Sequence, residues 1–191
     1  MRWDGAPRQV AAPSVAATAG WIAAVTLATA AFSLVLACAT PFPALAALAG
    51  TRMAPRPAAG LVLASWLANQ AIGFTLLGYP LTANAFGWGV AMVLAALLAT
   101  AAALWTQRLP AATWLVTSAA FALAFVLYEA ALLAATVPLA SGPEAFSAPV
   151  VAWVLWINLV ALTGLLALHR LATMAGLRID RERPALAGAG A

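Results

Sequence analysis

The hydrophobic positions of this chain fall into long unbroken runs separated by short polar or proline-rich stretches. Five runs are each long enough to cross a bilayer as a helix. They lie at about residues 14–39, 58–79, 87–105, 111–134 and 148–169. A sixth run, Ala44 to Gly50, follows a Thr-Pro-Phe-Pro link, and its helix covers only about 10 Å. A helix of that length cannot cross a hydrocarbon core of about 30 Å unaided.

The positions of the arginines decide how the short run is counted. Arginine occurs in both tails and in the turns at 51–57 and 106–110. It is absent from the other connections, which lie at 40–43, 80–86 and 135–147. Short loops that carry arginine stay on the cytoplasmic side of a membrane. Basic and non-basic connections alternate only if the short run counts as a crossing, so the pattern predicts six segments with both termini cytoplasmic.

A short second segment has a consequence for the link that precedes it. Pro41 to Pro43 would then lie near the middle of the membrane. Irregular backbone at that depth is tolerated only where it is buried in protein or lines a cavity. We therefore expect a cavity open to the outer side, with the Thr-Pro-Phe-Pro link near its floor.

Composition agrees with a membrane protein. The 191 residues are 65% hydrophobic and 7% charged, whereas soluble domains carry about 25% charged residues. The first apolar run is long enough to span, so it is interpreted as a retained helix and not as a cleaved signal. The fold class predicted is an all-α integral membrane protein, a six-segment transmembrane helical bundle in a bacterial-type inner membrane. Its domain would be residues 14–170, between cytoplasmic tails at 1–13 and 171–191.

Polar and aromatic side chains gather in the outer half of the predicted bundle. Polar groups within a membrane are costly and usually face the bundle interior. One shared pocket for a ring-containing organic ligand would explain their common depth. The candidates for substrate binding are Cys38, Thr40, Phe42, Trp66, Asn69, Gln70, Tyr79, Asn84, Glu129 and Asn158.

Several candidates also have a purely structural interpretation. Asn69, Gln70 and Asn158 would equally serve to hydrogen-bond one helix to another, and Cys38 would equally be a small core residue. Glu129 is harder to explain in this way, because no Lys or Arg lies within any predicted span to pair with it. Glu129 is either protonated or faces a wet cavity. One hypothesis is that it contacts a ligand or takes part in proton transfer.

Motifs that would carry catalysis or bind a resident cofactor were not found. His169 is the only histidine, which excludes bis-histidine haem ligation and the histidine-rich site of a nickel or cobalt permease. The chain has no phosphate-binding glycine loop, no HExxH and no GxSxG. We therefore expect neither an enzyme nor a nucleic-acid-binding protein, and no cofactor beyond a transported ligand.

Small residues recur at every fourth position of the first run. They are Ala16, Gly20, Ala24 and Ala28, and they fall on one face of a helix. Such a stripe lets another helix approach closely. The partner is either a helix of the same chain, as ordinary packing, or a separate subunit that docks on this face.

Over about residues 14–170 the pattern resembles the substrate-binding S-components of energy-coupling factor vitamin transporters. That family has six helices, cytoplasmic termini and an outward-facing pocket capped by the outer loops. Its first helix carries a small-residue AxxxA motif that docks a transmembrane coupling subunit, which works with ATPases. Ala16, Gly20, Ala24 and Ala28 match this motif in kind. The resemblance implies a membrane subunit for uptake of a vitamin-like molecule.

The small cobalamin-specific S-components of Gram-negative bacteria are similar in size to this chain. They use a cysteine to ligate the corrinoid cobalt, and Cys38 is the only residue here that fills that role. The alternatives from other classes are an accessory or assembly subunit of a larger membrane complex and a small channel or permease acting alone. In an accessory subunit the polar groups would only join helices.

Overall fold

The computed structural model describes residues 14–35, 40–140 and 143–175, and these residues contain helices and turns without any strand. The helices are α1 (Val15–Val35), α2 (Phe42–Arg52), α3 (Pro55–Thr75), α4 (Ala83–Trp105), α5 (Thr113–Ala135) and α6 (Ala148–Met174). Two short 3-10 helices, η1 (Thr106–Arg108) and η2 (Pro143–Phe146), lie in the connections. The expected all-helical fold is therefore confirmed in the described residues, and each predicted apolar run corresponds to one helix.

Four helices are long and apolar enough to cross a membrane. They are Pro55–Thr75, Ala83–Arg108 with η1 included, Thr113–Ala135 and Ala148–Met174. The described apolar part of α1, Val15–Ala31, is shorter than these. Six α-helices among the described residues agree with six segments, while the number of crossings and the side of each terminus stay predictions.

Local chemistry sets several helix ends away from the expected positions. α3 begins at Pro55, earlier than expected, because proline suits the first turn of a helix, where its missing N–H has no partner to lose. It ends at Thr75 and not at Tyr79, and Gly78 then turns the chain with φ of 68°. α4 starts four residues early because the Thr82 hydroxyl caps it by accepting a hydrogen bond from the backbone N–H of Ala85.

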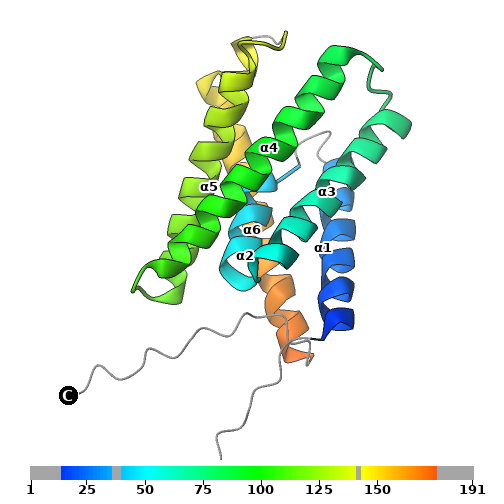
Figure 1. Cartoon of the computed structure of the whole chain (residues 1–191). Helices are drawn as coiled ribbons and strands as arrows, with labels where there is room; N and C mark the ends of the chain where they lie inside the picture. Colours follow the sequence, from blue (N-terminus) through cyan, green and yellow to red (C-terminus); the bar gives the residue numbers. More distant parts are fainter. Residues whose placement is uncertain (1–13, 36–39, 141–142, 176–191) are drawn as a thin grey trace, which may run out of the picture.

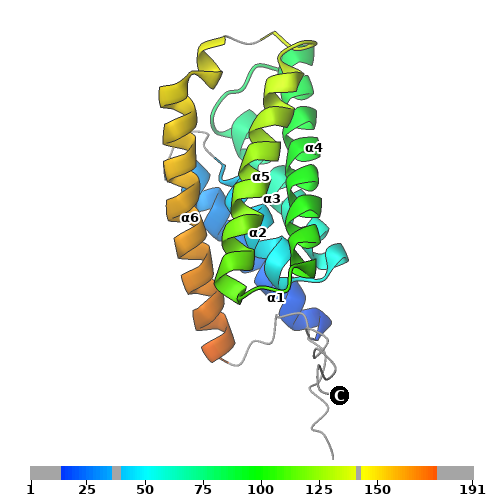
Figure 2. The same cartoon turned by 90° about the vertical axis from the view of Figure 1, so that its left-hand side faces the viewer.

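α2 is the centre of the bundle. Every residue from Phe42 to Gly50 is buried, and the helix packs against α3, α4, α5 and α6. The views in Figures 1 and 2 place it in the lower half of the bundle, with its N-terminal end near mid-height. The long helices α3 to α6 extend beyond α2 toward the upper end.

A glycine lets α2 and α4 approach each other closely. A Cβ built on Gly50 would lie 2.5 Å from the Cβ of Ala103. The carbonyl of Gly50 also accepts a hydrogen bond of 3.2 Å from the Gln107 side chain in η1. The lower end of α2 is therefore fixed against the end of α4.

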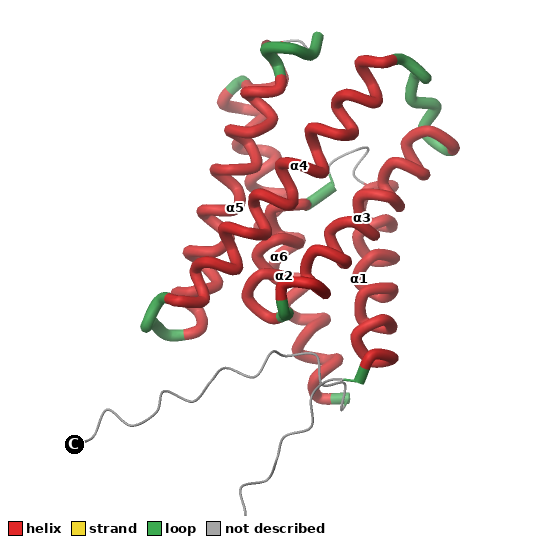
Figure 3. Tube along the Cα trace, viewed as in Figure 1, coloured by secondary structure: helices red, strands yellow, loops and turns green. Residues whose placement is uncertain are grey.

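The connections of the chain alternate between the two ends of the bundle (Figures 1 and 3). The start of α1, the α2–α3 turn, the α4–α5 turn and the end of α6 lie at the lower end. The α3–α4 and α5–α6 connections lie at the upper end. The described arginines, Arg52, Arg56, Arg108 and Arg170, all belong to lower-end segments. The spatial order is thus the one that the positive-inside rule predicts for a lower, cytoplasmic end.

α1 and α6 are joined to the rest more loosely than the other helices. α1 packs mainly against α3, and α6 mainly against α2. The two meet near the lower end, where the rings of Trp21 and His169 are in edge contact with centroids 5.5 Å apart. Large apolar side chains stay exposed on both helices, among them Leu27 and Trp153. Such a surface suits a lipid environment.

Candidate functional site

The N-terminal end of α2 is where most of the predicted site residues meet. Pro41 and Pro43 have no backbone N–H, so Ala44 carries one of the first donors of the helix without a helical partner. The side-chain oxygen of Asn158 in α6 accepts that hydrogen bond at 3.1 Å. The amide nitrogen of Asn158 donates to the carbonyl of Val154 in its own helix at 3.0 Å. Asn158 is 1% exposed, and it fastens α2 to α6.

A second set of bonds joins the same end of α2 to α3. The Thr40 hydroxyl donates a short hydrogen bond to the side-chain oxygen of Asn69. The amide nitrogen of Asn69 lies 3.4 Å from the side-chain oxygen of Gln70, a long hydrogen bond. Thr40, Asn69 and Gln70 therefore form one connected polar group.

Trp66 and Gln70 connect this polar group to α4, where both contact Gly89. The Trp66 indole N–H donates to the carbonyl of Gly89 at 2.8 Å. A Cβ on Gly89 would lie 2.3 Å from the amide nitrogen of Gln70, so the glycine makes room for that side chain. The sequence analysis missed Gly89. Its only sequence signal is a glycine within an apolar helical run, which does not say which side chain approaches it.

Phe42 and Glu129 lie near the interface of α2 with α5. The ring of Phe42 is fully buried, and its centroid is 6.0 Å from that of Tyr128. Glu129 follows Tyr128 in the upper half of α5 and is half-buried. Within the described residues its carboxyl group makes no hydrogen bond and no ion pair. Glu129 is thus an acidic group in an apolar helix whose partner, if any, comes from outside these contacts.

Tyr79 and Asn84 lie apart from this group, at the upper end of the bundle. The Tyr79 ring covers Gly73 and makes an edge contact with Phe74 at 5.9 Å between centroids. The Asn84 side chain exchanges two hydrogen bonds of 3.0 Å with the backbone of Ala140, and the Trp88 indole donates to the same carbonyl at 3.2 Å. These contacts tie the α3–α4 and α5–α6 connections to the bundle.

Cys38 lies outside the described residues. Asn158, Asn84 and Trp66 each make a hydrogen bond to the backbone of another segment, so in this structure these side chains join elements. The predicted common ligand pocket stays a prediction. The four residues of the small-residue stripe, Ala16, Gly20, Ala24 and Ala28, are all exposed, and nothing lies within 4 Å of a Cβ built on Gly20.

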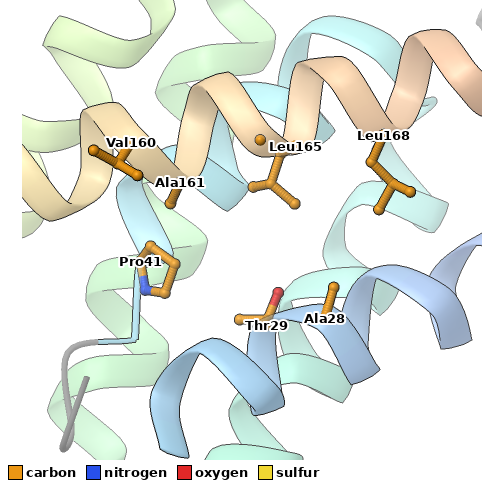
Figure 4. A pocket seen from close by; sticks show the side chains of 8 residues that line it. Ala28, Thr29, Pro41, Val160, Ala161, Leu165 and Leu168 are labelled. Carbon is orange, nitrogen blue, oxygen red and sulfur yellow. The ribbon is translucent and has the colours of Figure 1, made fainter. Parts of the chain in front are cut away.

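An apolar cavity of about 250 Å³ lies between α1, the start of α2 and α6 (Figure 4). Its walls are Ala28, Thr29, Pro41, Val160, Ala161, Gly164, Leu165 and Leu168. Ala28 belongs to the small-residue stripe, and the described residues proposed for substrate binding do not line this cavity. Pro41 belongs to the link beside which a cavity was expected, but the walls from α1 and α6 were not predicted, because they are ordinary positions of two helices far apart in the chain.

Comparison with known proteins identifies no relative of the chain. No protein family, no curated protein and no solved structure matches it.

Proposed function

We propose that the protein is a membrane-embedded subunit that binds a vitamin-like organic molecule for uptake, with a corrinoid such as cobalamin as one candidate ligand. In this proposal it lies in the inner membrane of a bacterium, with the lower end of the bundle facing the cytoplasm. It would work as an energy-coupling factor S-component does, with a transmembrane coupling subunit and ATPases as partners.

The observation that carries the proposal is Glu129. An ionisable side chain within an apolar helix is costly unless it has a partner or a function. Its carboxyl group is half-buried and has no hydrogen-bond or ion-pair partner among the described residues. It lies in the C-terminal half of α5, next to Tyr128 in sequence. A ligand that enters from the upper end and meets the Thr40–Asn69–Gln70 group would supply the missing partner.

The exposed small-residue stripe of α1 supports the part of the proposal in which a partner subunit docks on this helix. Ala16, Gly20 and Ala24 are exposed, and so is Ala28, which also lines the cavity between α1 and α6. A helix of another protein could approach this face closely.

A second candidate is an accessory or assembly subunit that binds no ligand. It is favoured by Asn158, Asn84 and Trp66, each of which makes a hydrogen bond to another segment of the chain. In that case purification from native membranes yields the chain with a protein partner and without a small molecule.

The experiment that separates the two candidates is ligand identification followed by a matched pair of variants. Mass spectrometry of the protein purified in detergent is expected to find a vitamin-sized compound, with cobalamin as the first compound to be titrated. Glu129→Gln should then weaken binding about tenfold to a hundredfold, because a hydrogen bond to a charged group contributes about 1.5–3 kcal/mol. The control is Glu144→Gln, an exposed position in the α5–α6 connection, which should leave affinity unchanged. Equal affinities for both variants, or no bound compound, would favour the accessory role.

A further inference from the structure

Among the described residues, Thr29 is the only one with a polar side chain in the walls of the cavity between α1 and α6. Seven of its eight wall residues have no polar side chain. The eighth, Thr29, uses its hydroxyl to donate a hydrogen bond of 2.8 Å to the carbonyl of Val25 in its own helix. An occupant of this cavity must therefore be apolar over the whole length that lies inside.

The position of the cavity restricts its occupant further. Figure 4 shows Leu165 and Leu168 of α6 pointing toward Ala28 and Thr29 of α1, with Pro41 at one end of the space. The wall of α6, from Val160 to Leu168, is the middle of a helix long and apolar enough to span a membrane. Hydrocarbon chains would surround this depth of the bundle. An apolar space of this kind that stays empty forfeits the dispersion contacts of its walls.

The contact between Trp21 and His169 excludes, as the occupant of the cavity, a partner helix that runs along the full length of α1 and α6. Trp21 is 3% exposed and His169 is 5% exposed, and their rings meet between α1 and α6 near the lower end of the bundle. A straight helix about 10 Å across would collide with this pair. A flexible chain that is one methylene wide could bend past the pair and still fill the space above it.

We propose that one acyl chain of a membrane phospholipid occupies this cavity and completes the packing between α1 and α6. The proposal is independent of the transport function and of the Glu129 site. The lipid would be a structural part of the folded protein. Its acyl chain would fill the apolar space where α1 and α6 do not contact each other directly. It would differ from the surrounding lipid in touching residues that are shielded from the outer surface, such as Thr29 and Leu165, which are 4% and 8% exposed.

Native mass spectrometry tests the proposal directly. The full chain is reconstituted in nanodiscs of palmitoyl-oleoyl phosphatidylethanolamine and phosphatidylglycerol, and it is released at increasing collision energy. The wild-type protein should keep one phospholipid after the others are lost. Ala28→Leu and Gly164→Leu should lose this lipid, because each fills the cavity. A Cβ is tolerated at position 164, since nothing lies within 4 Å of one built there. The matched control is Ala122→Leu, an exposed position of α5, which should keep the lipid.

A second measurement on the wild-type protein covers the case in which a variant fails to fold. A phosphatidylcholine with a diazirine deep in one acyl chain is added to the nanodiscs, and the adducts are mapped after illumination. Adducts on the shielded residues Thr29 and Leu165 are expected. Adducts confined to exposed residues such as Leu27 and Leu171 would overturn the proposal. In the mass spectrometry experiment, three results would also overturn the proposal. They are a wild-type protein that keeps no lipid, equal lipid retention by the cavity variants and the control, and the mass of a second protein chain in place of the lipid.

Discussion

Replacing Gly50 by alanine is expected to lower the midpoint of thermal unfolding markedly. The new Cβ would lie 2.5 Å from the Cβ of Ala103 and 2.9 Å from backbone atoms of Ala103 and Leu104. Backbone atoms cannot turn aside as a flexible side chain can, and α2 has no free side toward which it could move. Overpacking of this kind typically costs about 1–3 kcal/mol. The change is measured by tryptophan fluorescence during heating in detergent.

The matched control for this prediction is Gly20→Ala. Gly20 is exposed in α1, and a Cβ there meets nothing within 4 Å. Alanine is favoured over glycine in a helix by about 0.8–1.0 kcal/mol, so the unfolding midpoint should stay the same or rise. Adding Ala103→Gly to the Gly50→Ala variant should recover part of the loss, because it removes one of the colliding atoms. Equal effects of the two Gly→Ala changes would mean that α2 and α4 are not in close contact.

Replacing Asn158 by leucine is expected to have the second large effect. The change keeps a similar volume but removes the only described acceptor of the Ala44 N–H. Ala44 and Asn158 are both buried, and a buried unpaired donor costs about 1–3 kcal/mol. The interior of a membrane offers no water to replace the lost acceptor. We expect a lower unfolding midpoint and faster amide hydrogen exchange in the peptide that covers α2.

Thr163→Val is the control on the same helix. The Thr163 hydroxyl is exposed and donates only to the carbonyl of Leu159, one turn earlier in α6. Its loss should change stability by less than about 0.5 kcal/mol and leave hydrogen exchange in α2 unaffected. If both variants exchange at the wild-type rate, Asn158 does not hold α2 in place.

The helices could be predicted from the sequence because their signals are local. Unbroken apolar runs predict the long helices, and the prolines around Phe42 predict a separate short helix after a break. The order of the arginines predicts which connections share an end, and the structure places Arg52, Arg56, Arg108 and Arg170 in segments at one end. The cap formed by Thr82 could also have been predicted, because threonine before a helical run is a common N-cap.

The tertiary contacts could not be predicted, because they depend on segments far apart in the chain. The bond from Ala44 to Asn158 joins residues 114 positions apart. An asparagine in an apolar run signals a buried polar partner without identifying it. The place of Gln70 beside Gly89 and the cavity between α1 and α6 likewise follow only from how the helices cross.

The central claim of this account is that α2 returns the chain from mid-membrane to the cytoplasmic side. Labelling of single cysteines with a membrane-impermeant maleimide tests it most directly, in intact cells and in a Cys38→Ser background. Four exposed positions are used, in the variants Arg56→Cys, Leu81→Cys, Arg108→Cys and Glu144→Cys. Leu81→Cys and Glu144→Cys should be labelled from outside, and Arg56→Cys and Arg108→Cys only after the membrane is permeabilised. Labelling of Arg56→Cys and Arg108→Cys in intact cells, with the other two protected, would contradict the claim, because the α2–α3 turn would then lie on the outer side of the membrane.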